Sequence, residues 1–361
     1  MLAKLLYLTK GILGRTFYII PEQPERIQIE ITNRCNYTCG MCPRESFQLP
    51  ESDISPDLFR LIIDRITQGT DQMRASRYHV TLTGWGEPLL HPSLVDMIAY
   101  TKSKGHTVGA TTNGLLLAPF INRFIEMPLD KLTISLDSVE AQDNTGEGHP
   151  SHEVVRKNIE ALLRQRSPQK KPTVTIQITM HDKKQCLDTI RYAAEAGADR
   201  VYLVRLNIPL GRKNFVRPTL EEELNIYKES EKIARTCGLQ VDNNYTAFDS
   251  RPLRFLYKRL RPAMYRFDRY CPKPYDYLYV NIDGKATPCC DLPRYEVGNL
   301  LKQDVKDIWQ SENMQYFRAH QDEVCGNCDA LRLRHLNPGE MEPLLDKKSE
   351  KPQISQITQI L

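Results

Sequence analysis

The stretch RIQIEITNRCNYTCGMC, residues 26–42, joins a predicted β-strand, RIQIEIT, to a loop that carries three cysteines. Cys35, Cys39 and Cys42 follow one another in a C-x3-C-x2-C spacing. A site of soft thiolate ligands usually has four of them. Three thiolates on a four-iron cluster leave one iron open, and an open metal position is where chemistry occurs. The loop therefore predicts a metal site completed by a substrate or a cofactor.

Strands and helices alternate from about residue 25 to residue 237. After RIQIEIT, five further segments predict strands: YHVTLTG, HTVGATTNG, KLTISLD, TVTIQITM and RVYLVRL. Helices are predicted between them. One begins with Ser55 as its cap and Pro56 at its first position, and two others end at Gly105 and Gly197. This alternation predicts an α/β fold with parallel strands and right-handed crossovers. Ligands of such folds bind at the carboxyl ends of the strands, where the cysteine loop lies.

The composition limits the classes of protein that fit. A length of 361 residues suffices for one large domain with a small one, or for two medium ones. The net charge of +4 is too mild to indicate a nucleic-acid partner. Eight of the ten cysteines gather in clusters at short spacings, which indicates metal binding in a reducing compartment and predicts a cytoplasmic protein.

The first 24 residues form an apolar segment interrupted by Lys4, Lys10 and Arg15. The segment has no small-residue cleavage site, so it does not read as a signal peptide. No uncharged apolar run reaches the ~18 residues of a membrane span. Two interpretations stay open for this segment: a short helix that caps the main domain, or a basic amphipathic segment in peripheral contact with a membrane.

The loop CNYTCGMC resembles the C-x3-C-x2-C loop of the radical S-adenosylmethionine (radical SAM) superfamily. The strand–helix alternation is similar to that family's partial (β/α)6 barrel, which is of the TIM type. The resemblance implies a 4Fe–4S cluster on Cys35, Cys39 and Cys42, with S-adenosylmethionine on its fourth iron. It also implies a reductant such as flavodoxin or ferredoxin. An electron from the reduced cluster then yields a 5′-deoxyadenosyl radical, which abstracts hydrogen from a substrate C–H bond. The alternative for the loop is a zinc knuckle.

Further positions match the family's cofactor site. The segment GWGEP, residues 84–88, resembles its Gly-Gly-Glu-Pro motif, with Trp85 where glycine is commoner. The resemblance implies that Glu87 pairs with the ammonium group of S-adenosylmethionine. Methionine stands before the last cysteine where an aromatic residue that seats the adenine is common. The other positions that the resemblance assigns to the cofactor are Gly84, Trp85, Gly86, Asn113, Ser135, Asp137 and Met41.

A second set of cysteines lies between residues 271 and 328. Its order resembles the SPASM and shorter twitch extensions of radical SAM enzymes. No cysteine follows residue 328, so the resemblance implies the version with one auxiliary 4Fe–4S cluster, as in aminocyclitol dehydrogenases of the family. A zinc site of the same thiolates is the alternative. The neighbouring Cys290 could replace Cys289, which the spacing from Gly284 favours. The four implied ligands are Cys271, Cys289, Cys325 and Cys328.

The chain divides into four predicted parts: an N-terminal segment (1–24), the barrel (25–237), the auxiliary-cluster domain (238–335) and a polar tail (336–361). In the third part, YLYVNIDGKATPCC predicts a hairpin with a two-residue turn at Asp283–Gly284. VKDIWQSENMQYFRAH predicts a helix. The basic stretch 251–269 is either a binding face for an acidic, phosphorylated or peptidic substrate or a solvated linker.

These features predict a radical SAM enzyme that oxidises or rearranges its substrate. The auxiliary cluster would accept the electron lost by the substrate radical. One candidate substrate is a small molecule, such as a sugar, an aminocyclitol or a cofactor precursor. The other is a ribosomally made peptide, which we expect less because only about 25 residues precede the first strand. A non-catalytic iron–sulfur carrier or zinc scaffold is the alternative from another class, and the three-cysteine loop argues against it.

Overall fold

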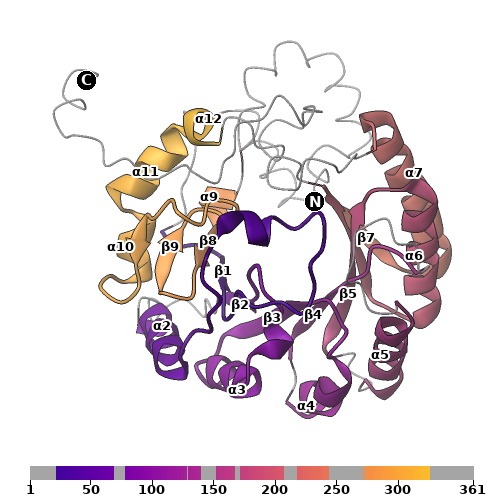
Figure 1. Cartoon of the computed structure of the whole chain (residues 1–361), viewed down its shortest axis with the longest axis horizontal. Helices are drawn as coiled ribbons and strands as arrows, with labels where there is room; N and C mark the ends of the chain where they lie inside the picture. The colour runs from indigo at the N-terminus through magenta and orange to yellow at the C-terminus, as the bar shows by residue number, and fades with distance from the viewer. Residues whose placement is uncertain are drawn as a thin grey trace.

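The computed structural model describes residues 22–68, 78–127, 129–139, 152–166, 171–206, 218–243, 271 and 273–325. The predictions for residues 1–21, for the basic stretch 251–269, for Cys328 and for the tail lie outside these residues. Within them, a ten-stranded sheet has the order β10-β9-β8-β1-β2-β3-β4-β5-β6-β7. Figure 1 shows this sheet curved into an open arc with helices along its outer side. The predicted fold class, a partial α/β barrel followed by a small C-terminal unit, is confirmed.

Seven neighbouring strands of the sheet are parallel. They are β1 (Arg26–Ile29), β2 (His79–Leu82), β3 (Thr107–Thr112), β4 (Lys131–Ser135), β5 (Thr173–Met180), β6 (Arg200–Arg205) and β7 (Gln240–Asn243). The sequence predicted the first six. β7 was missed because it has four residues, three of them polar, and so lacks an apolar strand pattern. It also lies beyond the predicted boundary at residue 237, and that boundary stays a prediction.

Six helices connect these strands and cover the outer face of the sheet (Figure 1). They are α2 (Pro56–Gln68), α3 (Leu94–Ser103), α4 (Ile121–Glu126), α5 (His152–Gln165), α6 (Lys183–Ala196) and α7 (Leu220–Cys237). The local signals acted as predicted: Ser55 Oγ accepts a hydrogen bond of 3.2 Å from the backbone N–H of Leu58, and α6 ends at Gly197 with φ +83°. Among the described residues, no helix combines the length and the apolar character that crossing a bilayer requires.

The hydrophobic core lies between the sheet and these helices. In β5, Val174 and Ile176 are fully buried, whereas Thr175 and Gln177 are partly exposed. Because successive strand residues point to opposite faces, the polar residues line the inner side of the arc. Each fully buried apolar side chain of the core, such as Phe59, contributes roughly 1.5–3 kcal/mol relative to an exposed one. The fold thus leaves a polar inner surface at the carboxyl ends of the strands.

The C-terminal elements extend the same sheet, because β8 pairs in parallel with β1. These elements are α9 (Lys273–Asp276), β8 (Tyr277–Val280), β9 (Lys285–Thr287), β10 (Gly298–Asn299), α10 (Val305–Trp309), α11 (Glu312–Ala319) and α12 (Gln321–Val324). The segment 305–320, predicted to be helical, is helical except for a break at residues 310–311. The break separates α10 from α11 because Ser311 caps α11, accepting a hydrogen bond of 3.2 Å from the N–H of Met314.

The predicted β8–β9 hairpin is confirmed, but its two-residue turn is wrong. The N–H of Asn281 donates to the carbonyl of Lys285, and that of Gly284 donates to the carbonyl of Asn281, both at 3.0 Å. Three residues therefore form the loop, with Gly284 at φ +75°, as in a type I turn followed by a bulge. The side chain of Asn281 favours this longer turn, since its Oδ1 accepts from the N–H groups of Asp283 and Lys285.

Candidate active site at the carboxyl ends of the strands

The three-cysteine loop leaves the sheet at the end of β1 and turns back on itself. The N–H of Cys42 donates to the carbonyl of Cys39 at 3.0 Å, and the N–H of Tyr37 lies 3.4 Å from Cys35 Sγ. Burial raises the pKa of the Cys39 thiol to about 12, and the charges of Cys42 and Cys35 add to the shift. The three sulfurs thus share a half-buried site and repel one another when ionised. This donor set fits an iron–sulfur cluster, which supplies the missing positive charge.

Polar contacts fix the backbone that precedes the first cysteine. The guanidinium of Arg34 makes two hydrogen bonds to the carboxylate of Asp53, at 2.9 and 2.6 Å. The side chain of Asn33 donates to the carbonyl of Pro50 at 2.8 Å and accepts from the N–H of Ser52 at 2.7 Å. Because such paired contacts restrict rotation, the loop leaves β1 in a defined direction.

The segment GWGEP packs directly against the cysteine loop. A Cβ atom on Gly86 would lie 2.4 Å from the carbonyl oxygen of Thr32 and 2.5 Å from that of Arg34. The N–H of Glu87 donates to the same Arg34 carbonyl at 2.8 Å. A Cβ on Gly84 would lie 2.3 Å from Cγ of Glu30. Both glycines are therefore needed for close approach, and the structure brings this segment and the cysteines together as the sequence predicted.

The carboxylate of Glu87 is buried and joins the loops after β2 and β3. Its Oε1 accepts from the N–H of Leu89 at 3.0 Å and from Oγ1 of Thr112 at 2.7 Å. Its Oε2 accepts from the N–H of Asn113 at 2.7 Å. Burial raises the pKa of Glu87, and these hydrogen bonds oppose that shift. Its predicted pairing with an ammonium group stays a prediction, and such a group would share oxygens that already accept three hydrogen bonds.

Two other predicted residues lie beside the cysteine loop. The side-chain amide of Asn113 donates to Oδ1 of Asn36, inside the loop, at 2.8 Å. Asp137 accepts a hydrogen bond of 2.6 Å from the N–H of Thr179, which ties the ends of β4 and β5 together. The Asp137 charge also contributes to the raised pKa of Cys39, so the two groups are near one another. The structure thus brings Asn113 and Asp137 to the same site.

Ser135 and Met41 are half-buried at positions consistent with the prediction, at the end of β4 and inside the cysteine loop. The proposed contacts of both residues with S-adenosylmethionine stay predictions.

The second set of cysteines follows the hairpin. The ligand atoms of Cys289, Cys290 and Asp291 lie within 4.8 Å of one another, and they form a group that could hold a metal ion within the described part of the chain. Lys273 Nζ lies 3.4 Å from Cys289 Sγ and 3.5 Å from the Asp291 carboxylate. Burial alone would lower the pKa of Lys273, but Asp291 and the two thiols raise it well above its usual value. This region therefore supplies its own cation to the sulfurs.

Gln321 links two more of the predicted ligands. Its side-chain oxygen accepts from the N–H of Cys271 at 2.9 Å, and its carbonyl accepts from the N–H of Cys325 at 2.7 Å. The charge of Cys271 contributes to the pKa shift of Cys289, so these two thiols are near one another. Their donor set fits an iron–sulfur cluster.

A junction that the sequence did not predict connects the two cysteine-bearing regions. The indole N–H of Trp85 donates to the carbonyl of Cys290 at 3.1 Å. The Trp85 ring packs edge-on against Phe47, with ring centroids 5.1 Å apart. Phe47 ends the short 3-10 helix η2 (Pro43–Phe47), and its carbonyl accepts from Arg294 at 3.0 Å. The one available signal was a bulky tryptophan where the family motif commonly has glycine.

Glu30 is the functional candidate that the sequence reading missed. It directly follows β1, is 3% exposed and accepts a hydrogen bond of 2.9 Å from the backbone N–H of Trp85. Burial raises the pKa of its carboxyl group, and the hydrogen bond from the Trp85 N–H opposes that shift. The sequence did contain a signal for Glu30, because this carboxylate stands between two isoleucines of the predicted apolar strand RIQIEIT.

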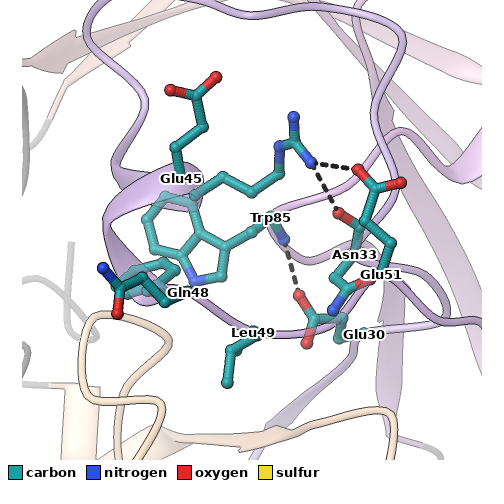
Figure 2. Close-up of a pocket in the computed structure, with 9 residues that line it drawn as sticks. Glu30, Asn33, Glu45, Gln48, Leu49, Glu51 and Trp85 are labelled. Carbon is teal, nitrogen blue, oxygen red and sulfur yellow. Dashed lines mark hydrogen bonds and ion pairs between the residues drawn. The ribbon is translucent and has the colours of Figure 1, made fainter.

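A pocket of 340 Å³ lies beside these residues. Figure 2 shows the Trp85 indole along one side of it and the Glu30 carboxylate turned toward the backbone of Trp85. Arg44 also lines the pocket and donates to Glu51 at 2.9 Å. The pocket thus adjoins the cysteine loop, η2 and the segment GWGEP.

Comparison with protein families agrees with this geometry. The model of the radical SAM superfamily matches residues 29–184, and the model of an iron–sulfur cluster-binding domain, SPASM, matches residues 271–329. The chain belongs to the radical SAM superfamily, in the subgroup that carries a SPASM domain. Such a chain binds a 4Fe–4S cluster, S-adenosylmethionine and an auxiliary iron–sulfur cluster.

Several relatives align over most of this chain, two of them as follows. The tungsten-containing aldehyde ferredoxin oxidoreductase cofactor-modifying protein of Pyrococcus furiosus is 27% identical over 302 residues, 81% of this chain and 82% of that protein. The AdoMet-dependent heme synthase of Methanosarcina barkeri is 26% identical over 333 residues, 88% of this chain and 90% of that protein.

A solved structure shares the fold. SuiB of Streptococcus suis, bound to its precursor peptide SuiA, superposes with a TM-score of 0.62 at 15% identity. The match covers 91% of this chain and 73% of that one.

Proposed function

We propose that this radical SAM enzyme abstracts hydrogen from a C–H bond of a small molecule, such as a sugar, an aminocyclitol or a cofactor precursor, and oxidises it. The observation that carries the proposal is the junction at Trp85, whose indole bonds to Cys290 while its neighbour Gly86 abuts the cysteine loop. A substrate held there would lie between the group that generates the radical and a second redox group.

The first site needs three sulfurs on one loop, and we assign Cys35, Cys39 and Cys42 to it. When bound there, the 4Fe–4S cluster with S-adenosylmethionine supplies the electron and the 5′-deoxyadenosyl group that abstract hydrogen. The protein holds these partners by fixing the loop through Arg34 and by closing it with the backbone of Gly86. Polar groups at the strand ends, Asn113 among them, would then orient the cofactor.

The second site needs ligands at Cys271, Cys289, Cys325 and Cys328. Its auxiliary cluster supplies an electron acceptor for the substrate radical. We assign Cys289 as the ligand because of its spacing from Gly284, with Cys290 as the alternative. Lys273 lies 3.4 Å from Cys289 Sγ, and its positive charge would favour the reduced state of a cluster held there.

The relatives support a small-molecule substrate over a peptide. Two relatives that align over more than four fifths of this chain are named for modifying a cofactor and for making heme. SuiB was solved with a peptide, but its 15% identity supports only the fold. We therefore assign peptide modification as the alternative, with a flavodoxin- or ferredoxin-type reductant and a cytoplasmic location proposed for either.

The test is reductive cleavage of S-adenosylmethionine by anaerobically reconstituted protein. Dithionite should yield 5′-deoxyadenosine, and iron analysis should give about eight irons per chain, four for each cluster. Protein that binds iron but forms no 5′-deoxyadenosine would instead be a non-catalytic carrier. Deuterium transferred from a labelled substrate into 5′-deoxyadenosine would then identify the C–H bond that reacts.

A further inference from the structure

The pocket of Figure 2 is lined by residues on both sides of the first cysteine loop and by Trp85. Trp85 lines it and donates from its indole to the carbonyl of Cys290, on the side of the second set of cysteines. Phe47 also lines it and accepts from Arg294 of the same C-terminal segment. On the other side, η2 begins directly after Cys42. A group bound in this pocket would thus be close to both regions.

The charge of the lining is negative. Three carboxylates, those of Glu30, Glu45 and Glu51, face one guanidinium, that of Arg44. Arg44 donates to Glu51 at 2.9 Å and to the carbonyl of Asn33 at 3.4 Å, so its charge is already compensated. The carboxylates therefore exceed the cations in this pocket, which disfavours an anionic ligand and favours a cationic one.

Glu30 differs from the other two carboxylates because it is 3% exposed. Its Oε1 accepts from the N–H of Trp85, and the hydroxyl of Tyr279, also fully buried, is its other polar neighbour. Among the residues that the structure describes, neither of these neighbours carries a positive charge and no cation forms an ion pair with Glu30. A buried carboxylate without a cation is costly, and a cationic ligand would offset that cost.

Two aromatic side chains also line the pocket. Trp85 and Phe47 pack edge to face with centroids 5.1 Å apart, and both line the pocket. A cation over the face of tryptophan gains an attraction that is largest where water is excluded. A buried carboxylate beside an aromatic face is the combination that binds alkylammonium groups.

We propose that this pocket receives a protonated amine of the substrate, with Glu30 as its ion-pair partner and the Trp85 ring as the surface on which it packs. The inference rests on the function proposed above and narrows its substrate class to amine-bearing molecules. The amine could belong to an amino sugar or aminocyclitol, or to a lysine side chain, and the ammonium chemistry is the same for both.

The chain offers a direct reporter because it has two tryptophans, Trp85 and Trp309. Trp309 is fully buried between α10 and the C-terminal core and serves as an internal reference. We would label the anaerobically reconstituted enzyme, saturated with S-adenosylmethionine, with 5-fluorotryptophan. The Trp85→Phe variant assigns the two fluorine resonances. The probes are D-glucosamine against D-glucose, and Nα-acetyl-L-lysine amide against the neutral Nα-acetyl-L-norleucine amide.

At least one amine should shift the Trp85 resonance saturably and leave that of Trp309 in place. Its neutral counterpart should bind about tenfold or more weakly, as expected when a charge-assisted contact is lost. A response to glucosamine alone assigns the amine to a small molecule, and a response to the lysine derivative alone assigns it to a peptide. No response to either amine, or an equal response to the neutral compounds, would overturn the proposal.

Glu30→Gln removes the charge and should weaken amine binding about tenfold or more, with the affinity for S-adenosylmethionine measured in parallel. Glu195→Gln, an exposed carboxylate on α6, is the matched control and should change nothing. Unchanged amine affinity in Glu30→Gln contradicts the proposal. So does a selective loss of S-adenosylmethionine binding, which would assign Glu30 to the cofactor. If Glu30→Gln does not fold, the comparison of amine with neutral probe in the unmodified enzyme decides. Absence of 5′-deoxyadenosine in that enzyme would refute the proposed function separately.

Discussion

The two cysteine-bearing regions of this chain differ in the charged groups that surround their sulfurs. In the loop after β1, Cys39 is affected by burial and by two neighbouring thiols, and the Arg44 charge is a minor opposing effect on Cys35. In the second region, Lys273 Nζ lies 3.4 Å from the Sγ atom of Cys289, the cysteine that follows the hairpin. The first region therefore depends on its metal for positive charge, whereas the second contributes an ammonium of its own. This difference fits a reactive site with an open position and a second site that is fully ligated.

We expect the largest loss of activity from substitutions in the first cysteine loop, which should abolish 5′-deoxyadenosine formation. Replacing Cys35, Cys39 or Cys42 with alanine removes one of three thiolates, and a cluster held by two should be labile. No 5′-deoxyadenosine should form with dithionite in any of the three variants. Cys237→Ala, an exposed thiol at the end of α7, is the control and should behave as the unmodified chain. Cleavage at the unmodified rate in one of the three would remove that cysteine from the assignment.

The converse change tests the second region. A Cys271→Ala/Cys289→Ala variant should lose about four of about eight irons and still cleave S-adenosylmethionine. Its melting temperature should fall, because a small metal-binding unit owes much of its stability to its metal. Cys290→Ala is the matched comparison and should keep all the iron. If Cys290→Ala lost the cluster and Cys289→Ala retained it, the ligand would be Cys290. Bound zinc in place of iron would make this region a structural zinc module.

Glu87→Gln tests whether the carboxylate binds the cofactor or only the fold. An amide provides one acceptor oxygen where the structure uses two, so either Asn113 or Leu89 would meet an NH2 group. If Glu87 also pairs with the ammonium group, the dissociation constant for S-adenosylmethionine should rise roughly ten- to hundredfold. Calorimetric titration at constant iron content measures this. A lower melting temperature with unchanged affinity would restrict Glu87 to a structural role.

Gly86→Ala tests the contact between GWGEP and the cysteine loop. The added Cβ would meet two carbonyl oxygens at 2.4 and 2.5 Å, so backbone must move at a cost of roughly 1–3 kcal/mol. Gly197→Ala is the contrasting variant, since nothing lies within 4 Å of its added Cβ and only its φ of +83° is unfavourable. In denaturant unfolding, the free energy of unfolding should fall with denaturant concentration at the same slope in both variants. Iron loss should accompany Gly86→Ala alone, and equal iron content in the two variants would argue against a tight contact at Gly86.

How much of this could be predicted from the sequence depends on the range of the interactions. The start of α2 at Pro56, the end of α6 at Gly197 and the spacing of the cysteines are local signals, and the structure agrees with them. The hydrogen bond of Trp85 to Cys290 spans 205 residues, and no local pattern encodes it. Glu30 was missed for a similar reason. Its burial depends on Gly84, which reaches it only through the pairing of β1 with β2.

The smallest predicted effect concerns the junction between the regions. Trp85→Phe keeps an aromatic ring against Phe47 but removes the N–H that the carbonyl of Cys290 accepts. Losing one neutral hydrogen bond should cost roughly 0.5–1.5 kcal/mol in the free energy of unfolding. Trp85→Leu should cost more, because the ring contact is lost as well. A junction that only packs the chain would lower the melting temperature and leave the auxiliary cluster unchanged. If it positions the second region, the reduced auxiliary cluster of Trp85→Phe should also show an altered electron paramagnetic resonance spectrum, since Cys290 directly follows Cys289 in the chain. An unchanged spectrum together with unchanged stability would mean that this bond does not connect the two regions in solution.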